Sequence, residues 1–148
     1  MLRMAALLVC ALLACANIAA AQDDRPIGIV KTVSGEAFIL REGRRQAALP
    51  GDRLVVGDFL STGATGGMGV ILRDDTLLSL GPSTQIGVEQ FAFEPAQQKL
   101  ALVLRVTRGV IEYLSGQISR LSPGSVRIET PVATLGIRGT HLIARIVP

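Results

Sequence analysis

Residues 99–106 read KLALVLRV, and this segment decides the class of fold. Every second residue in it is apolar, the four being Leu100, Leu102, Leu104 and Val106. Side chains of an extended strand point alternately to opposite faces, so a period of two places all four on one face. A helix would need apolar residues three and four positions apart. The segment therefore predicts a β-strand with one buried face.

The same alternation recurs before and after this segment, in short runs rich in Val, Ile and Leu. The apolar positions of these runs are Met68, Val70 and Leu72, then Ile86 and Val88, then Val126 and Ile128, and finally Leu142, Ala144 and Ile146. Gly and Pro separate the runs, as at Gly81-Pro82 and Pro123-Gly124, and both residue types favour turns. We therefore expect a single all-β domain of short strands, built like a jelly roll or a β-solenoid.

Two further segments refine the expected architecture. GEAFIL at 35–40 resembles GVIEYL at 109–114, which predicts a stack of two similar units. QFAFEPAQQ at 90–98 predicts one long connection between strands. We expect Phe91 and Phe93 of this connection to fold back onto the core.

The composition excludes several classes of site. The chain has 148 residues, a formal net charge of +3, one His and two Cys, and only 3% of its residues are aromatic. One His and two Cys cannot form a Cys/His zinc module, and no Ser-His-Asp arrangement accompanies His141. The basic residues are scattered without aromatic partners, which argues against nucleic-acid binding. We therefore expect no catalytic residue, no cofactor and no metal.

The first 21 residues have the layout of a secretory signal peptide. Arg3 precedes an apolar run that ends before Ala19-Ala20-Ala21, and we expect cleavage after Ala21. This predicts a periplasmic or secreted protein, with residues 22–27 as a short linker and residues 28–147 as the domain. Two alternatives remain open. LLAC, ending at Cys15, resembles a lipobox and predicts a lipid anchor on that cysteine, and an uncleaved segment would instead anchor the protein in a membrane.

The order of the motifs along the chain resembles the FecR domain, from about residue 28 to residue 146. The most specific motif is TPVATLGIRGT at 130–140, with the signature residues Thr130, Pro131, Ala133, Ile137, Arg138, Gly139 and Thr140. A second motif provides the turn residues Gly51, Asp52, Gly57, Asp58, Thr62 and Gly63. The resemblance implies an extracytoplasmic, non-enzymatic all-β domain. It also implies a part in sensing and signal transfer across the cell envelope, as in the stand-alone, exported members of the family.

The chain departs from the family pattern at one turn. Asp74-Asp75-Thr76 stands where the family usually has Asp-Gly-Thr or Asp-Gly-Ser. Glycine is preferred in such a turn because the turn needs a positive φ, which Asp tolerates better than most residues.

The last predicted strand, residues 141–147, suggests a place for a partner. Members of the family often continue for another hairpin, so we expect this strand to be an open edge or to be covered by another element. An open edge can accept a strand of another envelope protein through main-chain hydrogen bonds. The alternative is a structural or a glycan- or small-anion-binding protein that uses Arg138, Arg108 or Arg44-Arg45.

Arg138 and the two Gly-Asp pairs each allow two interpretations. Arg138 could bind an anion, but a structural role is preferred, in which it ties turn carbonyls or the carboxylate of Asp52 or Asp58 across the stack. Asp52 and Asp58 could suggest calcium, but a calcium ion needs about six to eight converging oxygens. We therefore expect these two residues to cap tight turns.

Overall fold

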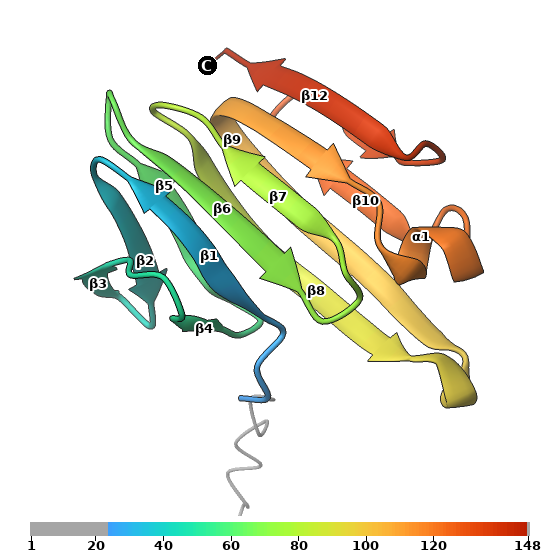
Figure 1. Cartoon of the computed structure of the whole chain (residues 1–148). Helices are drawn as coiled ribbons and strands as arrows, with labels where there is room; N and C mark the ends of the chain where they lie inside the picture. The colour runs from blue at the N-terminus through green and yellow to red at the C-terminus, as the bar shows by residue number, and fades with distance from the viewer. Residues whose placement is uncertain (1–23, 148) are drawn as a thin grey trace, which may run out of the picture.

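The computed structural model describes residues 24–147, and the regular secondary structure of this part of the chain is almost all β-strand (Figure 1). The strands are β1 (Gly28–Ser34), β2 (Ala37–Arg41), β3 (Arg44–Ala47), β4 (Arg53–Leu54), β5 (Phe59–Thr62), β6 (Gly67–Leu72), β7 (Leu77–Leu80), β8 (Gln85–Glu94), β9 (Lys99–Leu114), β10 (Val126–Glu129), β11 (Thr134–Gly136) and β12 (His141–Ile146). The only helical elements in this range are η1 (Pro95–Gln97) and α1 (Gln117–Leu121). The predicted all-β class is confirmed.

The expected signal peptide, its cleavage site and Cys15 lie outside the described residues. Within residues 24–147, no helix is both long and apolar enough to span a membrane. Ile27, the last residue of the expected linker, is already part of the fold. Its side chain is buried and its amide donates a hydrogen bond to the carbonyl of Leu54 at 2.7 Å.

The strands form one sheet that curls until its two halves face each other (Figure 1). Its strand order is β3-β2-β5-β8-β9-β7-β6-β1-β4, and β10 and β12 also pair with β9. The long strand β9 joins the halves: residues 99–108 pair with β8, whereas residues 109–114 pair with β12 and end beside β7. We call the two parts the β8 half and the β7 half. Every described pairing is antiparallel except that of β9 with β10.

At one end of the molecule, which we call the crossover end, the chain passes four times between the halves. The crossings are residues 35–36 between β1 and β2, 63–66 between β5 and β6, 81–84 between β7 and β8, and Gly109 within β9. Neighbouring crossings are joined by backbone hydrogen bonds, from Gly63 to Glu36 at 2.8 Å, from Ser83 to Gly63 at 2.9 Å, and from Gly81 to Val110 at 2.8 Å. The four crossings therefore form one connected cap.

The hydrophobic core fills the space between the two halves. In the alternating segment at residues 99–106, three side chains are completely buried: Leu102, Leu104 and Val106. The alternating positions of β6, β8 and β10 are buried as well. Those of β12 pack against the core but stay partly exposed, because β12 lies at an edge of the β7 half.

The prediction of a long connection at residues 90–98 is wrong. Residues 90–94 continue β8 and pair with β9, and only Pro95–Gln97 leave the ladder as a single 3-10 turn. Main-chain pairing with β9 extends the strand through a segment whose Pro and paired Gln residues suggested a loop. Phe91 and Phe93 do pack against the core, as expected, although from within a strand.

The two segments that resemble each other in sequence have corresponding surroundings. Each begins at a glycine in a crossing, where φ is 61° at Gly35 and 101° at Gly109. Each then lies between two antiparallel neighbours: β2 between β3 and β5, and the end of β9 between β7 and β12. The likeness in sequence thus corresponds to a likeness in local structure.

The turn between β6 and β7 contains Asp75, which stands where the family usually has glycine. Asp75 has a φ of 67°, the positive value for which glycine is usually chosen. Asp74 is completely buried, and its carboxylate accepts hydrogen bonds from the hydroxyl of Thr76 at 2.8 Å and from the amide of Ile118 at 3.2 Å. Asp74 therefore ties this turn to α1.

Replacing Asp75 with glycine is expected to raise the free energy of unfolding by about 0.5–1 kcal/mol, because glycine adopts a positive φ without steric cost. The exposed hydrogen bond that Asp75 accepts from Gln117 contributes little. Urea unfolding measures the change. As a control, Asp52→Gly should lower the free energy of unfolding, because it removes a turn cap. If Asp75→Gly instead lowered the free energy of unfolding, the positive φ of Asp75 would not be a source of strain.

Tyr113 provides a test of the core by titration. It is the only Tyr of the chain and is completely buried, and its hydroxyl has no hydrogen-bond partner among the described residues. Burial raises the pKa of Tyr113 above its ordinary value, and the nearby charge of Asp74 adds to the rise.

We expect the absorbance change of tyrosine ionisation to occur above pH 10 in the folded protein and near pH 10 in concentrated guanidinium chloride. The folded state then holds its proton more tightly than the unfolded state, so the stability due to this group is lost as the pH rises beyond 10. A transition at the same pH in both states would show that Tyr113 is not buried.

Candidate functional site

The outer edge of β12 has no strand partner among residues 24–147. β12 pairs only with β9, from His141 beside Leu114 to Ile146 beside Gly109. The amide of Ser115 donates to the carbonyl of Thr140 at 2.9 Å, just before β12 begins. Because hydrogen-bonded and non-hydrogen-bonded pairs alternate in an antiparallel ladder, the main-chain groups of alternate β12 residues point away from β9. These outward residues are His141, Ile143 and Arg145.

The side chains of β12 separate into an inner and an outer face. Leu142, Ala144 and Ile146 pack against the core. Ile143, in the middle of the outer face, is 63% exposed. Near it, Nε2 of His141 lies 2.7 Å from Oε1 of Glu112. The edge strand thus offers an apolar side chain together with free main-chain groups.

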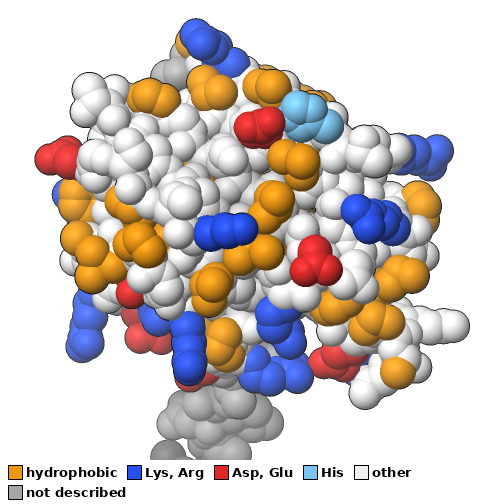
Figure 2. Space-filling view, viewed as in Figure 1, with side chains coloured by type: hydrophobic (Ala, Val, Ile, Leu, Met, Phe, Trp, Pro, Cys, Tyr) orange, Lys and Arg blue, Asp and Glu red, His pale blue; other side chains and the backbone are white. Residues whose placement is uncertain are grey.

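A row of apolar side chains crosses the outer face of the β7 half and leads to β12. The strand register places Ile29 beside Ile71, Ile71 beside Leu77, and Leu77 beside Leu114. Figure 2 shows hydrophobic side chains running diagonally over this face toward the single histidine. Ile29 and Leu114 at the ends of the row are exposed. Contiguous apolar surface of this kind is typical of binding surfaces.

The first part of the signature motif is a closed turn between β10 and β11. The amide of Thr130 donates to the carbonyl of Ala133 at 2.8 Å, and the amide of Ala133 donates back to the hydroxyl of Thr130 at 3.1 Å. Pro131 and Val132 form the tip of this turn, and Val132 is 92% exposed. These residues shape the backbone and present one apolar side chain to solvent.

The second part of the motif fixes the corner before β12. Ile137 is buried, and its amide donates to the carbonyl of Val126 at 3.1 Å. The carbonyl of Gly139 accepts a hydrogen bond from the hydroxyl of Ser115, whose amide holds Thr140. The backbone is therefore held on both sides of Arg138.

Arg138 itself is exposed. It forms no hydrogen bond or ion pair within residues 24–147, so the expected tie from Arg138 to Asp52 or Asp58 is not found. The arginine that binds the carboxylate of Asp58 is instead Arg41.

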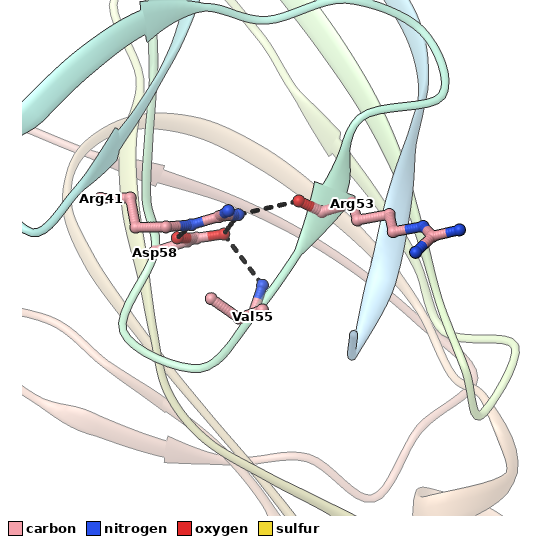
Figure 3. Close-up of polar contacts among 4 residues, drawn as sticks. All are labelled: Arg41, Arg53, Val55 and Asp58. Atoms are coloured by element: carbon pink, nitrogen blue, oxygen red, sulfur yellow. Dashed lines mark hydrogen bonds and ion pairs between the residues drawn. The ribbon is translucent and has the colours of Figure 1, made fainter. Parts of the chain in front are cut away.

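Asp58 forms the most complete polar cluster among the turn residues (Figure 3). Its carboxylate is completely buried and accepts two hydrogen bonds from Arg41, each of 2.7 Å, and one from the amide of Val55 at 2.9 Å. Arg41 also donates to the carbonyl of Arg53 at 2.8 Å. The hydrogen bond to Asp58 raises the pKa of Arg41 above its ordinary value, so this guanidinium is always charged.

The two Gly-Asp pairs form the same turn twice. Asp52 and Asp58 each donate an amide hydrogen bond to the carbonyl three residues earlier, at 3.1 Å and 3.2 Å. The carboxylate of each then accepts the amide of that same earlier residue, Leu49 or Val55. The preceding glycines have φ of 94° and 91°, which a type II turn requires at that position. Both carboxylates therefore have intramolecular roles.

Thr62 and Gly63 belong to the crossover end. The hydroxyl of Thr62 donates to the carbonyl of Gly81 at 2.6 Å and accepts the amide of Thr84 at 3.0 Å. Thr84, which the sequence analysis did not single out, is completely buried, and its hydroxyl accepts the amide of Val110 at 2.9 Å. Thr is common in strands and turns, so isolated Thr residues gave no signal for this network.

The residues identified from the sequence thus fall into separate groups. The turn residues stabilise the turns before and after β4 and the crossover end, and the signature residues shape the corner that leads into β12. Among residues 24–147, no group of three or more His, Cys, Asp or Glu side chains could hold a metal ion. The β12 edge and the apolar surface beside it form the candidate site.

Comparison with known proteins identifies the family. The family model described as FecR protein matches residues 58–147, which is more than half of the 148 residues. The match includes Asp58, the signature motif and β12, and it leaves out the Gly51-Asp52 turn. No curated protein and no solved structure matches the chain. The match indicates a domain related to signal transduction, and the chain belongs to the FecR protein family.

Proposed function

We propose that this protein is a non-enzymatic interaction module outside the cytoplasm, which takes part in envelope signalling by binding another envelope protein. The observation that carries the proposal is the outer edge of β12, which lacks a strand partner among residues 24–147. An extended segment of a partner can add to such an edge through main-chain hydrogen bonds, while the exposed side chains beside it provide specificity.

β12 differs from the other described strands that pair on one side only, which are β3, β4 and β11. β4 has two residues and β11 has three, so neither offers a long ladder. β3 carries Arg44 and Arg45, and charged side chains of this kind protect an edge against pairing. β12 has six residues, of which Leu142, Ile143, Ala144 and Ile146 are apolar. It is therefore the edge best suited to accept a strand.

The proposed location rests on the layout of residues 1–21. We expect the mature protein to begin at Gln22 when its mass is measured from an envelope fraction. An acylated N-terminus at Cys15 would indicate the lipid-anchored alternative. A protein that retains Met1 and fractionates with the cytoplasm would contradict the proposal.

Site-specific photo-crosslinking in cells tests the binding surface. A photoreactive amino acid at position 143 should give a discrete adduct with one envelope protein. The matched control is position 49, because Leu49 is 62% exposed and Ile143 is 63% exposed, yet Leu49 lies far from β12 in the strand order. Equal adducts at both positions, or none at 143, would refute the proposal.

Ile143→Pro then tests the mode of binding. Proline at this position removes an outward amide and leaves the hydrogen bonds between β9 and β12 in place. We expect the variant to lose co-purification of the crosslinked protein and to unfold within a few degrees of the parent. Binding that survives the substitution would exclude strand addition.

A further inference from the structure

A cleft opens at the crossover end, beside the last residues of β12. Its volume is about 470 Å³, and its walls are the crossing between β7 and β8, the bend of β9 and the end of β12. The lining residues are Pro82, Ser83, Arg108, Gly109, Val110, Arg145, Ile146 and Val147. Two of these residues are cationic and none is acidic.

The two arginines of the cleft lack the partners that other arginines of the chain have. The side chains of Arg108 and Arg145 form no hydrogen bond or ion pair within residues 24–147. By contrast, Arg41 pairs with Asp58, and Arg105 pairs with Glu129. Two cations on one cleft repel each other unless an anion lies between them, and guanidinium groups match a carboxylate in shape and charge.

The backbone that carries these side chains is held in place. The amide of Val110 is bonded to the hydroxyl of Thr84, and its carbonyl accepts the amide of Gly81 at 2.8 Å. Ser83 has a φ of 50°, an uncommon value for a residue other than glycine. Strained residues of this kind cluster at binding sites, and a rigid site loses little entropy on binding.

We propose that this cleft binds a carboxylate, and that the carboxylate belongs to the strand that pairs with β12. The inference rests on the proposed function and makes it more specific. Arg145 connects the two features, because its main-chain groups point outward from β12 and it is also one of the residues that line the cleft.

The register defines the sequence of the partner strand. Antiparallel pairing is the more stable arrangement per residue, and it places the partner residue opposite Arg145 two positions before the residue opposite Ile143. Both partner side chains lie on the same face. The partner strand should therefore have an acidic residue two positions before an apolar residue.

Nuclear magnetic resonance of the purified, isotopically labelled protein tests the inference with three probes. The first is glutarate, a free dicarboxylate. The second is an acetylated and amidated hexapeptide of sequence Thr-Glu-Thr-Val-Thr-Val, and the third is the same peptide with Gln in place of Glu. The signals to follow are the side-chain Nε–H groups of Arg108 and Arg145 and the backbone amide of Ile143.

We expect glutarate and the Glu peptide to shift both Nε–H signals, and the Gln peptide to shift only the Ile143 amide. Arg108→Gln and Arg145→Gln should each weaken glutarate binding by about tenfold, as expected for the loss of a hydrogen bond to a charged group. Arg127→Gln is the control, because Arg127 is an exposed arginine on β10 that does not line the cleft.

The remaining outcomes distinguish this inference from the proposed function. If both peptides shift the Ile143 amide equally and no probe shifts the Nε–H signals, strand addition stands and the carboxylate site is refuted. If glutarate shifts the Nε–H signals and neither peptide shifts the amide, the cleft binds free carboxylates and the assignment to a β12 partner strand is refuted. If no probe shifts any of the signals, both proposals fail.

Discussion

Replacing Gly109 with alanine is expected to lower the free energy of unfolding by about 4 kcal/mol. Gly109 has a φ of 101°, which costs a residue with a side chain about 1–2 kcal/mol. A Cβ atom would also lie 2.7 Å from Cβ of Thr84 and still closer to the Cα of that residue, so the backbone must move. Movement there breaks the hydrogen bonds between Thr84 and Val110 and adds the cost of overpacking, about 1–3 kcal/mol. Urea unfolding measures the loss.

Gly124→Ala separates the two causes. Gly124 has a similar φ of 95°, but a Cβ atom there would meet no atom within 4 Å. This variant should lose only about 1 kcal/mol, since it has the backbone cost without the collision. Equal losses for the two alanine variants would show that packing against Thr84 contributes nothing.

Replacing Arg41 with methionine is expected to lower the free energy of unfolding at pH 7 by about 3 kcal/mol. The side chain of Arg41 is 41% exposed, whereas that of Asp58 is 0% exposed. Removing Arg41 therefore leaves a buried carboxylate without its counter-charge, which costs more than breaking an ion pair whose two partners are both exposed. Urea unfolding at pH 7 measures the effect.

Arg53→Met is the matched control, because the side chain of Arg53 points away from the pair and only its carbonyl takes part (Figure 3). We expect a loss below about 0.5 kcal/mol for this control. A loss of equal size in both variants would exclude an electrostatic role for Arg41.

The sequence was sufficient to predict the core because strand periodicity is a local property. Leu102, Leu104 and Val106 lie on the buried face that their spacing indicated. The error at residues 90–98 arose because pairing with β9, a neighbour that local sequence does not reveal, extended β8.

The polar contacts were less predictable for the same reason. Asp58 was correctly expected to cap a turn, but nothing in the spacing of the chain selects Arg41 as its partner over Arg138. The alternation of Leu142, Ala144 and Ile146 was sufficient to predict the strand at 141–146, whereas its lack of an outer partner within residues 24–147 is seen only in the structure. The cleft could not, because Ser83, Arg108 and Arg145 meet only when three distant segments reach the crossover end.

Among residues 24–147, β9 is the only strand that pairs with strands of both halves, so the order of synthesis matters for folding. The segments before residue 99 can form two partial sheets, but no strand links them until β9 has been made. Such long-range pairing is intrinsically slow. The two-layered sheet of residues 24–147 can therefore be completed only after β9, which spans residues 99–114, has been made.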